Sequence, residues 1–120
     1  MDFTIPAAIS AEKTTFEDFL SRQMTPHLTT WHEQGEVPRN FFRRLGEGGW
    51  LGFDFNNGEV TEQSALKQAV LFERLAEFSA GVAVTVLVHV SLGTLGLHLF
   101  AGKSHKEKEV KSALRGETLI

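Results

Sequence analysis

The sequence contains no cysteine, so disulfide bonds and thiolate metal sites are excluded. The absence of thiols is compatible with a reducing compartment, and we expect a cytoplasmic protein. Excess positive charge is also missing, because 12 basic residues face 15 acidic ones and the net charge is −3. Since nucleic-acid binding requires a basic stripe, we expect no nucleic-acid partner.

Charged side chains are missing from residues 78–102, although they recur every few positions elsewhere. This run could form one buried central helix or one membrane span, since about 20 apolar residues cross a bilayer. Serine, threonine and two histidines, His89 and His98, lie inside the run, and no Trp or Tyr belt marks its ends. These features favour the buried helix, so we expect no membrane partner.

Apolar residues recur at helical spacing through most of the chain. They predict a first helix kinked at Pro26 and ending near Gly35, because proline removes one helical hydrogen bond. Three more helices are expected over about 38–46, 61–78 and 104–116, besides the apolar run. The sequence therefore predicts an all-α bundle of about five helices with a central apolar helix.

The helix boundaries come from capping residues. Thr14 or Thr15, Thr61 and Ser104 are the expected N-caps, and Glu107 completes a capping box with Ser104. We expect residues 1–12 to form an extended lead-in and residues 13–120 to form a single helical domain.

No short motif assembles a catalytic or ligand site. Gly102-Lys103-Ser104 lacks the upstream glycine of a phosphate-binding loop and follows a helix rather than a strand. His32-Glu33 begins like a zinc-protease motif, but Glu36 stands where the second histidine ligand is required. We therefore expect no catalytic, cofactor-binding or metal-binding residue in this chain.

The order of several longer segments is more informative than any one motif. They are Trp31–Pro38, Phe42–Gly52, Leu71–Ala76, Val88–Gly93, Leu99–Gly102, Lys106–Lys108 and Arg115–Glu117. Together they resemble the N-terminal helical domain of the acyl-CoA dehydrogenase family over roughly residues 10–120.

The resemblance implies flavin-dependent α,β-dehydrogenation of an acyl thioester. In that family a β-barrel middle domain makes most of the contacts with the flavin, and the catalytic glutamate lies in a C-terminal helical domain. Because the sequence ends at Ile120, we expect both domains to be absent from this chain. The expected partners are those domains, as another chain or as a removed remainder, and acyl-CoA. FAD is expected only in the assembled enzyme, and the chain alone is expected to be inactive.

The resemblance also implies that Val84, Val88 and Leu92 form one wall of the acyl pocket. Their i, i+4, i+8 spacing independently places them on one helical face. The alternative, that they are ordinary core residues, stays open, and we expect Val88→Asp to unfold the domain. For His89, a hydrogen-bonded core histidine is favoured over a ligand contact.

Two function classes remain. The chain is either the N-terminal part of an acyl-CoA dehydrogenase or a free-standing helical interaction module without chemistry. Without the other domains, we expect one side of the central helix and an apolar connector, Trp50, Leu51, Phe53 and Phe55, to be exposed. We therefore expect a homo-oligomer. The sequence does not identify the acyl chain.

Overall fold

The structure, a computed structural model, describes residues 4–52, 55–56, 59–60 and 62–119. It is an all-α fold with one small hairpin. The helices are α1 (Ala7–Gln23), α2 (Leu28–Gln34), α3 (Arg39–Glu47), α4 (Glu62–Phe78), α5 (Ala80–Leu87), α6 (Gly96–Phe100) and α7 (Lys103–Leu114). A 3₁₀ turn, η1 (Thr25–His27), and a π-helical segment, η2 (Val88–Leu95), complete the helical elements.

The first two helices form the kinked unit that the sequence predicts. Pro26 lies in η1, where the α-helical hydrogen-bond pattern is interrupted between α1 and α2. Gly35 ends α2 in the left-handed conformation, with φ 68°, and its N–H donates to the carbonyl oxygen of His32 at 3.3 Å. Both predicted breaks are confirmed.

The predicted start of α1 is wrong. The helix begins at Ala7 rather than near residue 13, so only residues 4–6 of the described lead-in are non-helical. Alanine favours helix, and Ile9 is buried at 6% exposure, which extends the apolar face by two turns. Thr14 and Thr15 lie inside the helix, and their hydroxyls donate to the carbonyls of Ser10 and Ala11.

The boundaries of the later elements also differ in detail. Helix α7 begins at Lys103 with Gly102 as N-cap, so Ser104 lies inside it and the predicted capping box is wrong. Gly102 is already extended, with φ −63° and ψ 153°, which lets the helix start earlier. Thr61 lies outside the described residues.

A two-residue antiparallel hairpin, absent from the prediction, precedes α4. In it β1 (Phe55–Asn56) pairs with β2 (Glu59–Val60), with Phe55 opposite Val60.

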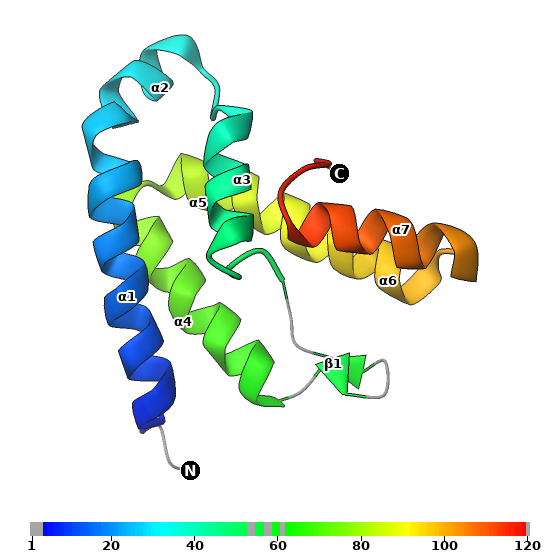
Figure 1. Cartoon of the computed structure of the whole chain (residues 1–120). Helices are drawn as coiled ribbons and strands as arrows, with labels where there is room; N and C mark the ends of the chain where they lie inside the picture. The colour runs from blue at the N-terminus through cyan, green and yellow to red at the C-terminus, as the bar shows by residue number, and fades with distance from the viewer. Residues whose placement is uncertain (1–3, 53–54, 57–58, 61, 120) are drawn as a thin grey trace.

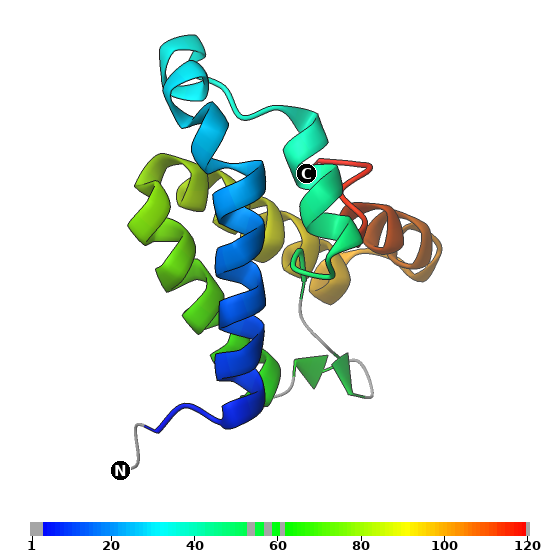
Figure 2. The same cartoon turned by 60° about the vertical axis from the view of Figure 1, so that its left-hand side comes forward.

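Figures 1 and 2 show how the helices are arranged. α1 and α4 lie side by side, and the chain turns at Ser79 into one long helix made of α5, η2 and α6. Ser79 is the N-cap of this helix, because its Oγ accepts a hydrogen bond from Val82 N. This helix runs behind α3, and α7 returns along α6. The predicted central apolar helix is thereby confirmed, although its π-helical middle was not foreseen.

The core lies where α1, α3, α4 and the long helix meet. Its least exposed large side chains are Leu20, Met24, Leu45, Leu51, Leu75, Val90 and Thr94. Aromatic rings pack between α1 and the α3 region, with centroids 6.1 Å apart for Phe19 and Phe41 of α3 and 4.6 Å apart for Phe19 and Trp50, which follows α3. Leu51 is 1% exposed and Trp50 is half-buried, so the expected exposure of the apolar connector is wrong at Leu51. The side chains of Phe53 and Phe55 lie outside the described residues.

Two glycines let α3 approach the end of α7 closely. A Cβ on Gly116 would lie 2.1 Å from the carbonyl oxygen of Phe42, and one on Gly46 would lie 2.2 Å from the backbone of Arg115. Gly116 also has a φ of 71°, which L side chains rarely adopt. The contact of α3 with the end of α7 therefore depends on glycine at both positions.

The long helix is also long and apolar enough, by length and composition alone, to cross a membrane. The stretch Ala80–Phe100 has a mean hydropathy of 1.8. In this fold, however, α3, α4 and α7 pack against it, and its buried side contains His89 and Thr94, both hydrogen-bonded. About two fifths of this stretch, 39%, is buried in the fold, so the helix contributes to the core with one side only.

Candidate functional site

The long helix has one buried and one exposed apolar face. Val82, Val86 and Val90 are at most 2% exposed and contribute to the core. On the opposite face, Val84, Val88 and Leu92 are 60%, 43% and 75% exposed. The three residues predicted for the acyl wall therefore share one surface and are not core residues. The expected burial of Val88 is wrong, because α3, α4 and α7 cover only the other side of the helix.

The exposed face, which we call the apolar face, continues along the helix. Further large hydrophobic side chains exposed on this helix are Leu87, Leu99 and Phe100. Phe100 is 87% exposed and lies at the end of the helix, next to the turn into α7. Several exposed large hydrophobic side chains on one helix often mark a contact site, since soluble monomers rarely expose large apolar patches.

The middle of the apolar face lies on the π-helical segment η2. In a π-helix the hydrogen bonds join residues five apart, and such segments occur often at functional sites. A π-helix has more residues per turn than an α-helix. Four residues exceed one full turn in the α-helix from Val84 to Val88 and fall short of one in the π-helix from Val88 to Leu92, so the two offsets partly cancel and Leu92 stays on the same side as Val84. The sequence reasoning, which assumed α-helical periodicity, missed this segment.

His89 occupies the buried side of η2. Its Nε2 lies 3.0 Å from the carbonyl oxygen of Ala113 in α7, and its ring meets the Phe42 ring of α3 edge-on at 5.6 Å. Because a carbonyl only accepts hydrogen bonds, Nε2 carries the proton. Burial lowers the pKa of His89 below 6.5, and the bond to Ala113 partly offsets this. His89 is a hydrogen-bonded core histidine in this fold, as the sequence favours.

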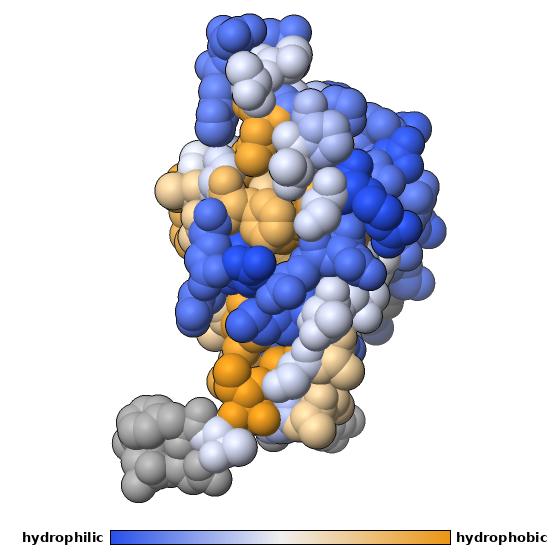
Figure 3. All heavy atoms as spheres, turned by 90° about the vertical axis from the view of Figure 1, so that its left-hand side faces the viewer, coloured by the Kyte–Doolittle hydropathy of each residue, from blue (hydrophilic) through white to orange (hydrophobic). Residues whose placement is uncertain are grey.

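A shallow hollow of ≈ 500 Å³ adjoins the start of α5. Its walls are Trp31, His32, Gly35, Glu36 and Val37 from the α2–α3 region, with Gly81, Val82 and Thr85 from α5. His32 Nε2 lies 3.3 Å from Ser79 Oγ, which joins α2 to the N-cap of α5. Figure 3 views the side of the molecule formed by α1, where hydrophobic residues reach the surface between hydrophilic ones.

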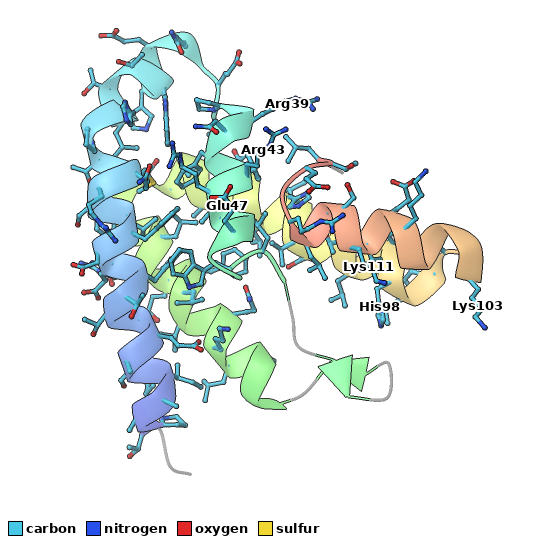
Figure 4. All side chains as sticks on the ribbon, in the orientation of Figure 1. Arg39, Arg43, Glu47, His98, Lys103 and Lys111 are labelled. Atoms are coloured by element: carbon cyan, nitrogen blue, oxygen red, sulfur yellow. The ribbon has the colours of Figure 1, made fainter. Side chains whose placement is uncertain are left out.

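Basic, acidic and histidine side chains project from α3 and from the arm made by α6 and α7 (Figure 4). Arg39, Arg43 and Glu47 project from α3, while His98, Lys103 and Lys111 lie on the arm made by α6 and α7 (Figure 4). Arg74 in α4 links to α1 through its Nε, 2.9 Å from Glu17 Oε1. Among the residues that the structure describes, no three His, Asp or Glu side chains lie close enough together to hold a metal ion.

Comparison with known proteins assigns the family. Residues 10–117 match the family model described as acyl-CoA dehydrogenase, N-terminal domain. The chain is 28% identical to benzylmalonyl-CoA dehydrogenase of Aromatoleum aromaticum and 22% identical to the probable acyl-CoA dehydrogenase YngJ of Bacillus subtilis. Each alignment covers 99% of this chain and 32% of the relative, so the chain spans about a third of their length.

The fold is similar to that of a solved relative. The crystal structure of glutaryl-CoA dehydrogenase from Mycobacterium smegmatis aligns with a TM-score of 0.84 at 25% identity. The alignment covers 97% of this chain and 30% of that one. The chain therefore belongs to the acyl-CoA dehydrogenase family, as its N-terminal helical domain.

Proposed function

We propose that this chain is the N-terminal part of a flavin-dependent acyl-CoA dehydrogenase and provides one wall of its acyl pocket. The observation that carries the proposal is the apolar face at Val84, Val88 and Leu92. These side chains are exposed here although they belong to the most apolar helix. The relatives are about three times as long, so a β-barrel and a C-terminal helical domain, on the same or another chain, would cover this face.

The chemistry of the face fits an acyl chain and not a flavin. Val84, Val88 and Leu92 have no side-chain hydrogen-bonding groups, whereas the pyrophosphate of FAD requires donors. FAD would therefore be held by the other domains and would supply the hydride acceptor. The role of this chain is to bind and orient the acyl group and to keep water from it. The identity of the acyl group depends on walls that other domains provide.

Co-expression with the barrel and C-terminal helical domains tests the proposal. The expected product is a yellow complex that reduces an electron acceptor when an acyl-CoA is added. Leu92→Asp should weaken acyl-CoA binding while flavin stays bound, and Arg22→Asp on α1 is the control, since Arg22 is exposed and remote from the apolar face. A chain that forms no complex with these domains would refute the proposal.

One observation favours the alternative of an interaction module without chemistry. The core is closed within the chain, since Leu20, Met24 and Val90 are fully buried without any other domain. A stable fold that ignores the barrel domains and binds no acyl-CoA would favour this second function.

The proposal includes self-association. The exposed hydrophobic side chains of the apolar face would be buried against a second copy when the other domains are not bound.

A further inference from the structure

The π-helical segment η2 contains a side-chain hydrogen bond that spans five residues. The one other threonine bond of this span among the described residues, from Thr25 to Leu20 O, is longer, at 3.5 Å, and lies where α1 passes into the 3₁₀ turn η1 rather than inside a regular helix. Thr14, Thr15 and Thr85 donate their hydroxyls to the carbonyl four residues earlier, as threonines in α-helices do. Thr94 instead donates to the carbonyl of His89, five residues earlier, at 2.9 Å. The side-chain bond of Thr94 therefore follows the π-helical register of the backbone.

This bond is shielded from water. Thr94 is 2% exposed and His89 is 3% exposed. A polar group left without its hydrogen-bond partner here would therefore destabilise the folded state. His89, whose carbonyl accepts the Thr94 bond, is itself held in place, because its Nε2 donates a hydrogen bond to the carbonyl oxygen of Ala113 in α7. The two bonds join Thr94, the η2 backbone and α7 in one buried chain of contacts.

We propose that Thr94, with His89, is a positioning residue that holds η2 in the π-helical register and thereby sets where Leu92 stands on the apolar face. Leu92 lies between the two, in the turn that the Thr94 bond closes. In an α-helical register Leu92 would rotate away from Val84, and the wall would lose its most exposed member. The consequence for acyl binding rests on the proposed function, whereas the consequence for the backbone does not.

A matched pair of variants tests the inference in the full chain. Thr94→Val keeps the shape and removes the donor, and Thr94→Ser keeps the donor. NMR contacts between Hα of one residue and the amide proton five residues on report the π register directly. They should appear over residues 88–95 in the wild type and in Thr94→Ser, and should be replaced in Thr94→Val by contacts four residues apart.

A Thr94→Val chain that keeps the five-residue contacts would overturn the inference. If that variant does not fold, Thr94→Ala gives the same test with less bulk. In an assembled enzyme, Thr94→Val should raise the KM for acyl-CoA several-fold with little change in kcat, and Thr94→Ser should restore it. Loss of the π register with an unchanged KM would refute the positioning of the acyl wall. Failure to assemble any enzyme would refute the proposed function and leave the backbone test intact.

Discussion

At the scale of single residues, the two faces of the long helix should respond oppositely to charge. Val90→Asp places an unpaired carboxylate in a fully buried position, which costs several kcal/mol, about the stability of a small domain. Val88→Asp places it on the apolar face, where Val88 is 43% exposed. Valine and aspartate have similar helix propensities, so we expect a loss below about 1 kcal/mol, from the partial burial of the valine side chain. Urea unfolding followed by circular dichroism measures both. Unfolding by Val88→Asp would mean that this face is buried.

His89 should make the stability of the domain depend on pH. Because burial lowers its pKa in the folded state, the unfolded chain binds a proton more readily. The free energy of unfolding should therefore fall as the pH drops below 6.5. Above that pH, the contribution of His89 to the free energy of unfolding should not change with pH. Thermal unfolding at pH 7.5 and 5.5 measures the difference, and His89→Gln should remove part of it.

At the scale of elements, sequence periodicity predicts the helices but not their exact ends. The helices follow from the spacing of apolar residues that the core requires, such as Phe16, Phe19 and Leu20 in α1. The predicted N-caps of α1 and α7 are wrong because more than one residue near each helix start can occupy the N-cap position. Thr14 and Thr15 satisfy their hydroxyls inside α1, and Gly102 replaces Ser104 at α7.

The candidate site is predictable to a similar extent. The i, i+4, i+8 spacing is enough to group Val84, Val88 and Leu92 on one face, but it does not tell an exposed face from a buried one. That depends on which side α3, α4 and α7 cover, and hence on tertiary packing. The π segment leaves only an indirect signal, two polar residues, His89 and Thr94, within an apolar run.

The packing of α3 on the end of α7 can be tested by two glycine substitutions. Gly35 and Gly116 both have positive φ, 68° and 71°, so alanine costs about 1–2 kcal/mol of backbone strain at either. Only at Gly116 would the new Cβ also meet backbone, at 2.1 Å from Phe42 O, whereas nothing lies within 4 Å at Gly35. Gly116→Ala should therefore lower the free energy of unfolding clearly more than Gly35→Ala. Equal losses would show that α3 does not approach α7 this closely.

At the scale of the whole molecule, the chain is a flat bundle of 40 × 37 × 21 Å with a closed core and an open apolar face. Under the proposed function, the other domains cover that face and hold the flavin. The purified chain alone should therefore retain no FAD and should not reduce an electron acceptor with any acyl-CoA. Absorbance near the flavin bands after purification gives the answer, and a stoichiometric yellow product would contradict the proposed division of roles.

The same open face should make the isolated chain associate with itself. Removing apolar surface from water contributes about 25 cal/mol per Å², so pairing of two such faces is favourable when nothing else covers them. Sedimentation over a range of concentrations should show dimers or larger species. The double variant Leu92→Ser, Phe100→Ser should shift the distribution toward monomer, because these are the two most exposed large hydrophobic side chains among the described residues. The matched control is Leu66→Ser, at 37% exposure on α4 and off the apolar face. A wild-type chain that stays monomeric and does not bind a hydrophobic dye would mean that the face is covered within the chain itself, and the interaction module would then be the better description.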